Sequence, residues 1–172
     1  MKTVILTGPK HSGKTSAGRA LASLRSCEFI DIDDLILQRT GKSPRQLYGE
    51  GQTVFQKAEA EAMAAITDEV GGEGQRVIAA GGGIIDNEEA AAVLKKAGAA
   101  VVYLNISAES AWERIEKSGE LPPFLRTENP RETHRVLHER RAAAYSRIAD
   151  IIIEAGAKTP REIAEEILRH LD

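Results

Sequence analysis

The chain of 172 residues has 42% apolar and 28% charged residues, close to the globular average, which excludes disordered and fibrous classes. A net charge of −3 gives no basic field for nucleic acid or an anionic membrane, and no apolar stretch approaches the ~18 residues of a membrane span. The single cysteine, Cys27, is typical of a reducing compartment. We expect one domain over residues 1–172, acting as a monomer in the cytoplasm without nucleic-acid or membrane partners.

Strand-like and helical segments alternate along the chain. Short apolar runs predict strands at 3–6, 29–32, 76–80, 99–104 and 151–154. Helical patterns predict helices at 14–24, 52–70, 87–97, 110–117, 130–146 and from residue 160 onward, with glycines breaking the chain at 71–74. Ser107 and Thr159 are the expected N-caps of two helices, and Pro130 is the expected first-turn residue of another.

This alternation predicts an α/β fold with a parallel sheet covered by helices on both faces. Sheets of this kind bind ligands at the carboxyl ends of their strands. Three unusual segments follow predicted strands directly: a glycine loop after the first, an acidic cluster after the second and a triple glycine after the third. We therefore expect these three segments to converge on one edge of the sheet.

The glycine loop matches the phosphate-binding pattern G-x-x-x-x-G-K-[ST] without a mismatch and lies between a predicted strand and helix. Its backbone N–H groups and the helix N-terminus suit phosphate oxygens. Lys14 is expected to reach the β- and γ-phosphates of ATP, and the Thr15 hydroxyl to bind Mg²⁺. His11 is expected to face solvent and to contribute mainly its N–H. The predicted nucleotide-binding residues here are Gly8, His11, Ser12, Gly13, Lys14, Thr15 and Ser16.

Asp31 and Asp33 are two residues apart, so on an extended segment they point the same way. At the mouth of a phosphate site, one carboxylate can hold Mg²⁺ and the other can accept the proton of an attacking hydroxyl. We predict Asp31 as the metal ligand and Asp33 as the catalytic base. The alternative is N-capping of a following helix, by Asp33 or, with a stronger claim, by Asp34.

These segments resemble the shikimate kinases in order and spacing, and the likeness covers essentially the whole chain. It rests on Lys14-Thr15, on Asp31-Ile32-Asp33, on the glycines 81–83 and on the run from Arg141 to Tyr145. It extends through residues 38–43, Phe55 with Glu59, and residues 101–104.

The resemblance implies transfer of the γ-phosphoryl group of ATP to the 3-hydroxyl of shikimate, with Mg²⁺. It implies a P-loop three-layer α/β/α sandwich with a five-stranded parallel sheet and a mobile lid, here at about 118–129. It also implies that Gly81, Gly82 and Gly83 line the acceptor pocket, that Arg141 grips the acceptor carboxylate and that Arg114 lies beside the adenine.

The chain departs from this family at three places. Gln56 replaces one of two arginines that clamp the acceptor carboxylate, Pro122 replaces an arginine of the lid, and Ala79-Ala80 stands where a hydroxyl is frequent. Lys57 could supply the positive charge that is missing at Gln56. Arg126 could supply the one that is missing at Pro122 if the loop folds differently. Three interpretations therefore stay open: a shikimate kinase, a kinase for another small anionic hydroxy compound, or a nucleotide-binding protein of low turnover.

Three other residues are expected to be structural. Trp112, on an apolar helix, is expected to pack in the interior rather than stack on adenine. His134 and His138 have the i, i+4 spacing of metal ligands, but no third ligand is indicated, so we expect them at the surface.

Overall fold

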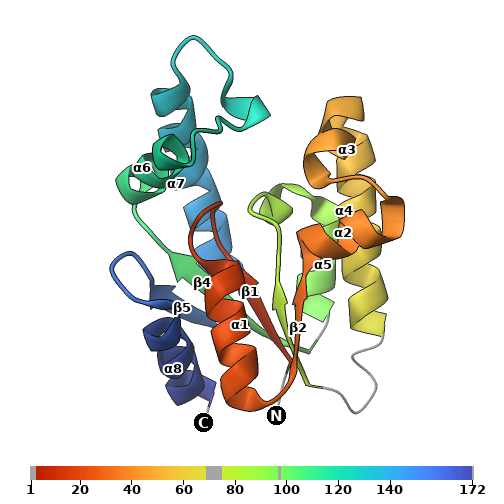
Figure 1. Cartoon of the computed structure of the whole chain (residues 1–172), viewed down its shortest axis with the longest axis vertical. Helices are drawn as coiled ribbons and strands as arrows, with labels where there is room; N and C mark the ends of the chain where they lie inside the picture. The colour runs from red at the N-terminus through yellow and green to blue at the C-terminus, as the bar shows by residue number, and fades with distance from the viewer. Residues whose placement is uncertain (1–2, 69–74, 97, 172) are drawn as a thin grey trace.

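The computed structural model describes residues 3–68, 75–96 and 98–171. Five strands form one all-parallel sheet in the order β2–β3–β1–β4–β5 (Figure 1). The strands are β1 (Val4–Thr7), β2 (Glu28–Asp31), β3 (Arg76–Ala79), β4 (Ala100–Asn105) and β5 (Ile151–Glu154). The predicted glycine break at 71–74 and the ends of two predicted helices, at 69–70 and 97, lie outside the described residues.

Helices connect the strands and cover both faces of the sheet. They are α1 (Lys14–Arg25), α2 (Ile32–Thr40), α3 (Pro44–Glu50), α4 (Gln52–Asp68), α5 (Glu88–Lys96), α6 (Ala108–Ser118), α7 (Pro130–Ile148) and α8 (Pro160–Leu171), with 3₁₀ turns η2 (Ile84–Asp86) and η3 (Pro123–Leu125). Within the described residues, none of these helices has the length and apolarity needed to cross a bilayer.

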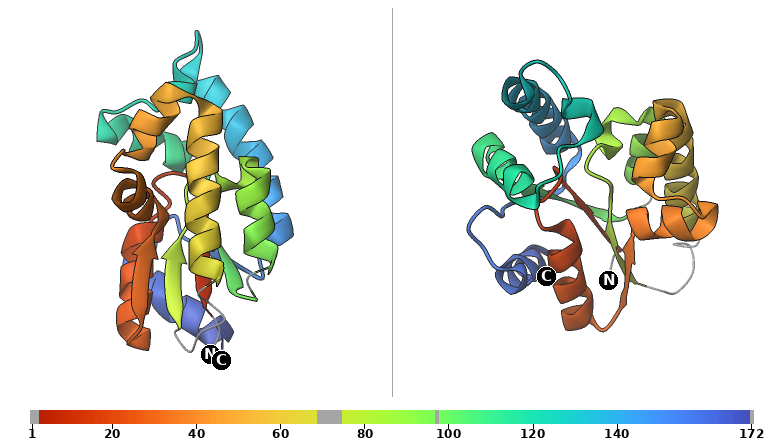
Figure 2. Two further views of the ribbon diagram at one scale, coloured as in Figure 1. Left: turned by 90° about the vertical axis from the view of Figure 1, so that its right-hand side faces the viewer. Right: turned by 45° about the horizontal axis from the view of Figure 1, so that its top comes forward.

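The strands alternate their side chains between two separate cores. Val4 and Leu6 of β1 pack with α1 and α8, whereas Ile5 packs on the opposite face with α2, α4, α5 and α7. Figure 2 shows α1 and α5 on opposite sides of the sheet. The predicted three-layer α/β/α sandwich is confirmed.

Parallel pairing brings the segments after β1 and β3 together. Leu6 of β1 lies in register with Ala79 of β3, and the N–H of Ala80 donates to the carbonyl oxygen of Leu6 over 2.9 Å. The next strand out aligns Asp31 with Ala79. The phosphate-loop motif, the acidic cluster and the triple glycine therefore leave the sheet side by side, as their positions after the strands predicted.

The main differences from the predicted elements follow β2. The strand ends at Asp31, and α2 begins at Ile32, because the Asp31 side chain accepts the N–H of Asp33 (3.0 Å) and caps the helix. The expectation that Asp34 provides the cap is therefore wrong, and the alternative in which Asp33 provides it is excluded as well. The short helix α3 was not predicted, although Ser43 and Gln46 form a capping box at its start.

The predicted caps elsewhere are confirmed. Ser107 accepts the N–H of Ser110 (3.1 Å) at the start of α6, and Pro130 occupies the first turn of α7. Thr159 and Glu162 exchange hydrogen bonds at the start of α8, with the Thr159 N–H donating to the carboxylate over 2.7 Å. Local sequence rules thus determine where these helices begin.

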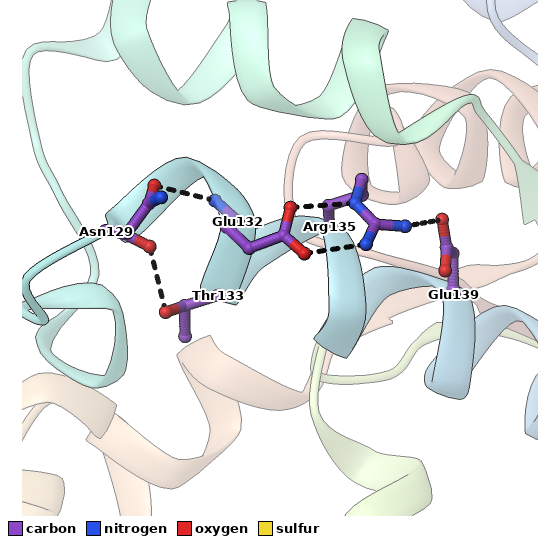
Figure 3. Close-up of polar contacts among 5 residues, drawn as sticks. All are labelled: Asn129, Glu132, Thr133, Arg135 and Glu139. Carbon is purple, nitrogen blue, oxygen red and sulfur yellow. Dashed lines mark hydrogen bonds and ion pairs between the residues drawn. The ribbon is translucent and has the colours of Figure 1, made fainter.

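The segment 118–129, called here the lid loop, connects α6 to α7 at the top of Figure 1. Asn129 ends it and caps α7 by accepting the N–H of Glu132 (3.2 Å), as Figure 3 shows. Farther along α7, Arg135 donates to Glu132 and to Glu139 on the exposed face of the helix. The Asn129 cap determines where α7 begins, and the exposed ion pairs of Arg135 add little to its stability.

A small third cluster lies beneath the lid loop. Trp112 packs with Ile115 and Leu125, and the predicted interior position of Trp112 is confirmed by its exposed fraction of 8%. His134 and His138 are buried as well, with the His134 ring 5.5 Å from that of Trp112. The expectation that these histidines lie at the surface is therefore wrong, because α7 turns this face toward α6 and the lid loop.

Candidate active site

A cavity of about 1090 Å³ lies at the carboxyl ends of β1, β2 and β3 and reaches between the lid loop and α3. It brings together most of the residues singled out from the sequence. Those that line it are His11, Gly13, Lys14, Thr15, Ser16, Asp31, Asp33, Gly81, Gly82, Gly83, Arg114 and Arg141. Gly8 and Ser12 are buried in the loop and do not line the cavity.

The loop from Gly8 to Thr15 has a backbone that depends on glycine. Gly8 and Gly13 adopt positive φ angles of 140° and 95°, which L-residues with side chains rarely adopt. A Cβ on Gly8 would also lie 2.7 Å from the carbonyl oxygen of Leu104 in β4. His11 adopts a positive φ of 62° despite its side chain. The loop is therefore held in a strained, closed conformation at the N-terminus of α1.

The Lys14 side chain reaches back to the start of this loop. Its Nζ donates to the carbonyl oxygens of Gly8 (2.9 Å) and Pro9 (2.8 Å). Burial lowers the pKa of Lys14 to about 8, against the opposing effect of the Asp33 and Asp31 carboxylates. The ammonium group is thus poorly solvated at the floor of the cavity, where the charge of a bound anion would restore its usual ionisation.

His11 and Arg114 join the loop to the lid side of the cavity. Arg114 of α6 donates from Nη1 to the backbone oxygen of His11 (2.7 Å) and from Nη2 to that of Gly156 (2.8 Å). The Nε2 atom of His11 is buried without a hydrogen-bond partner among the described residues, so the expected solvent-facing ring is wrong in this respect. Burial, followed by the charge of Lys10, lowers the His11 pKa, which favours the neutral ring.

The two oxygens predicted to bind metal lie against each other. The Thr15 hydroxyl, in the first turn of α1, donates to Oδ2 of Asp31 over 2.7 Å. The other oxygen of Asp31 is used in capping α2. A hydroxyl and a carboxylate are oxygen ligands of the kind that Mg²⁺ prefers, so the residues fit this ion.

Asp33 lies in the first turn of α2 rather than on an extended strand, and it still faces the cavity. Its Oδ1 would lie 3.8 Å from a Cβ placed on Gly81. Asp33 is open to the cavity, yet the surrounding walls remove enough water to raise its pKa, and Asp31 adds to this effect. A carboxylate with a raised pKa is a stronger base than a free one.

The triple glycine packs against three other parts of the cavity wall. A Cβ on Gly81 would lie 2.5 Å from Oε1 of Glu59, and one on Gly82 would lie 2.9 Å from the backbone nitrogen of Lys10. A Cβ on Gly83 would lie 3.2 Å from Nη2 of Arg141. The contact at Gly82 is with backbone and leaves no room for a side chain, whereas at Gly83 the end of the Arg141 side chain would have to shift by a few tenths of an ångström.

The cavity is also lined by charged residues for which no role was predicted from the sequence. Glu59, fully buried on α4, and Asp86, at the end of η2, both line the cavity, as do Lys10 and Arg140. The i, i+4 pair Phe55 and Glu59 was the one available signal for Glu59. The others become significant only when distant parts of the chain meet.

The departures noted in the sequence lie at the same cavity. Gln56 lines it and donates from Nε2 to the backbone oxygen of Asp86 over 3.3 Å. Pro122 lines it from the lid loop, whereas Arg126, the proposed substitute for a lid arginine, is not among the lining residues. Lys57 is exposed and pairs with Glu61 (3.9 Å), so it does not replace an arginine at position 56.

Comparisons with known proteins agree on one family. The model of the shikimate kinase family matches residues 10–172. A shikimate kinase from Pseudomonas entomophila is 37% identical over 172 residues, covering 99% of this chain and 96% of the relative, and one from Actinobacillus pleuropneumoniae is 33% identical with the same coverage.

Solved structures give the same result. The structure of a shikimate kinase from Acinetobacter baumannii in complex with shikimate has a TM-score of 0.88 and 31% identity, and the match covers 99% of this chain and 93% of that one. Members of this family are ATP-dependent phosphotransferases that act on a hydroxyl group. The convergence of the phosphate loop, the acidic pair, the triple glycine and Arg141 on one cavity fits that chemistry, and the chain belongs to the shikimate kinase family.

Proposed function

We propose that this chain transfers the γ-phosphoryl group of ATP to the 3-hydroxyl group of shikimate. The observation that carries the proposal is the shared cavity of the phosphate loop, Asp33 and Arg141, in a member of the shikimate kinase family. In this proposal the loop binds phosphate, Asp33 is the base and Arg141 binds the anionic acceptor, and the common cavity supports these roles.

On the donor side, the backbone of the loop from Gly8 to Ser16 holds the phosphates, and Lys14 contributes charge to the β- and γ-phosphates. Arg114 lies against the adenine. Thr15 and Asp31 would hold Mg²⁺, because their hydroxyl and carboxylate oxygens lie 2.7 Å apart and are ligands of the kind that this ion prefers. When bound, the ion would supply positive charge beside the phosphate oxygens.

On the acceptor side, Asp33 accepts the proton of the attacking hydroxyl, and its raised pKa favours that step. The backbone of Gly81, Gly82 and Gly83 forms the surface on which the acceptor ring lies. Arg141 binds the acceptor carboxylate through charge-assisted hydrogen bonds. The enzyme therefore acts by holding donor and acceptor in line rather than through a covalent intermediate.

The test is ADP release in a coupled assay with ATP, Mg²⁺ and shikimate. We expect turnover that depends on shikimate, that disappears in Lys14→Ala and that falls at least a hundredfold in Asp33→Asn with ATP affinity nearly intact. The matched control is Asp34→Asn, because Asp34 is exposed and does not line the cavity. Absence of stimulation across millimolar shikimate, with ATP bound, would contradict the proposal.

A second acceptor class is favoured by one observation. Gln56 is neutral and turned toward the backbone of Asp86, so it brings no charge to an acceptor carboxylate. A kinase for another small hydroxy acid would need less positive charge at position 56. In the same assay, a panel of such acids distinguishes the two, because the true acceptor gives the highest kcat/KM.

We also propose that the chain acts as one domain over residues 1–172 and as a monomer, in the cytoplasm, without nucleic-acid or membrane partners. The single cysteine and the net charge of −3 support this. Sedimentation at micromolar concentration tests the oligomeric state.

A further inference from the structure

Three charged side chains form a row at the acceptor end of the cavity. Asp86 stands in the middle. Its Oδ2 accepts a hydrogen bond from Nε of Arg141 (2.8 Å) and forms an ion pair with Nη2 of the same residue (2.8 Å). Its Oδ1 lies 2.8 Å from Nη1 of Arg140. The two arginines are neighbours on α7, and they reach the end of η2 from 55 residues away in the chain.

The Asp86 carboxylate is ionised in this row. Burial alone would raise its pKa, but the hydrogen bond from Arg140 and the charge of Arg141 outweigh that effect and lower it. Asp86 and Arg141 are both largely enclosed, with side chains 20% and 18% exposed, whereas Arg140 is 58% exposed. Arg140 is therefore the outer member of the row.

Arg141 is fixed with one edge unused. A guanidinium has five N–H donors in a planar fork, and the edge formed by Nε and Nη2 faces Asp86. The Phe124 ring of the lid loop lies 5.4 Å from Cζ of Arg141. No described residue accepts a hydrogen bond from Nη1. The edge that carries Nη1 is therefore available for a second carboxylate while Asp86 holds the first.

The charges decide whether that edge attracts an anion. Arg141 and Asp86 alone cancel, so the pair would offer a carboxylate no net charge. Arg140 adds one positive charge, so the three side chains together carry a net charge of +1. The neighbouring Glu59 carboxyl offsets this charge only in part, because burial raises its pKa to about 7. Gln56 supplies no charge from the facing helix, and Lys57 is paired with Glu61 on the exposed side of α4.

We propose that Arg140 is a specificity-determining residue for anionic acceptors: it neutralises Asp86 and so leaves the charge of Arg141 to the acceptor carboxylate. When the acceptor is bound, positive and negative groups alternate in the order Arg140, Asp86, Arg141 and acceptor carboxylate. This inference rests on the proposed function for the identity of the acceptor, and on the ion pairs above for the charge balance.

The experiment measures the KM for shikimate in three variants. In Arg140→Ala the row loses its net charge, and KM rises about fivefold to tenfold, the range expected for a partly exposed charge, with kcat within about twofold. In the double variant Arg140→Ala with Asp86→Asn, Arg141 again carries the one net charge, and KM returns to within about threefold of the parent value. Raising the salt concentration reduces the effect of Arg140→Ala.

Arg135→Ala is the matched control. It removes the same charge from the same helix, but its partners are Glu132 and Glu139, and it does not line the cavity (Figure 3). Its KM for shikimate should equal that of the parent. Thermal unfolding of all variants checks that each is folded at the assay temperature.

Two results overturn the inference: a KM for shikimate within twofold of the parent in Arg140→Ala, or a double variant as impaired as the single one. Calorimetric titration with shikimate distinguishes failure of the inference about Arg140 from failure of the proposed function. If the parent binds shikimate without turnover, the proposed function fails, and the same comparisons of Kd decide the inference. If the parent does not bind shikimate, both are rejected.

Discussion

Glu59 is a carboxyl group whose ionisation depends strongly on the fold. Its side chain is 1% exposed, Asn87 donates to its Oε2 over 3.0 Å, and its Oε1 has no hydrogen-bond partner among the described residues. Burial raises the pKa of Glu59 from its usual 4.5 to about 7, and the nearby Asp33 carboxylate adds to this, while Asn87 and Arg141 act in the opposite direction. At neutral pH the acceptor side of the cavity therefore contains a carboxyl group that is close to half protonated.

This shift predicts a pH-dependent stability. Between the usual pKa and the raised one, the folded chain holds a proton that the unfolded chain has lost, so the free energy of unfolding falls as pH rises through this window. Glu59→Gln mimics the protonated acid and removes this dependence. From about pH 5.5 to about pH 8, the variant should gain about 2 kcal/mol relative to the parent.

Chemical denaturation at the two pH values measures the effect. Glu61→Gln is the control, because Glu61 is on the same helix, exposed and paired with Lys57. Equal pH dependence in the parent and Glu59→Gln would show that Glu59 titrates normally.

At the residue scale, the sequence predicted the positions that a local motif specifies. Lys14 and Thr15 were found because the phosphate-loop pattern specifies them, and Asp31 and the triple glycine because they stand at the ends of predicted strands. The roles of Glu59 and Asp86 were not predictable in this way. Asp86 contacts Arg141, which is 55 residues away in the chain. The pKa of Glu59 is raised by burial, and the spacing of residues in the sequence does not predict how deeply a side chain is buried.

At the scale of elements, the contact between the phosphate loop and the triple glycine links the donor and acceptor halves of the cavity. β1 and β3 pair in parallel, and the loops that leave them meet at Lys10 and Gly82. Tyr145 of α7 holds this contact from behind by donating to the backbone oxygen of Gly82 over 3.0 Å. A substitution in the triple glycine should therefore weaken nucleotide binding.

Gly82→Ala tests this contact. Its Cβ would lie 2.9 Å from the backbone nitrogen of Lys10, so one of the two loops must move. We expect a loss of about 1–2 kcal/mol of unfolding free energy and roughly tenfold weaker ATP binding. Denaturation and calorimetric titration with ATP measure the two effects.

Gly49→Ala is the matched control for that substitution. Gly49 lies within α3, and a Cβ there would meet nothing within 4 Å. The same chemical change should therefore stabilise the chain by about 0.5–1 kcal/mol and leave ATP binding unaltered. If Gly82→Ala behaves like Gly49→Ala, the two loops are not in tight contact.

Among the helices and strands, the sequence predicted some boundaries and missed others. Strand positions were predicted within a residue or two, because apolar runs and glycines mark them. The end of β2 was placed one residue late, since the cap that Asp31 provides turns the chain into α2 at Ile32. α3 was missed although Ser43 and Gln46 marked its start, because seven residues are too few for a helical period to stand out.

At the scale of the whole molecule, the lid loop is attached less firmly than the sheet layers. The two large cores contain the sheet, whereas the apolar contacts described for the lid loop are the small cluster of Trp112, Ile115 and Leu125, with Leu121 beside it. The Phe124 ring lies against Arg141 of α7. One ion pair, between Arg45 of α3 and Glu120, joins the loop to the opposite wall at 3.1 Å, and both side chains are exposed. Exposed pairs contribute little, so the loop can open without disturbing the sheet.

Hydrogen exchange measures this difference directly. Several residues of the lid loop, including Leu121 and Phe124, line the cavity, so bound donor and acceptor would contact them and hold the loop closed. We expect amide exchange in 118–129 to slow roughly tenfold or more when ATP, Mg²⁺ and shikimate are added together, while exchange in β1 and β4 stays unchanged. Lys14→Ala, which lacks the phosphate contact, should show little slowing under the same conditions. Unaltered exchange in the lid loop, with both ligands shown by calorimetry to be bound, would mean that the loop is already closed in the free protein.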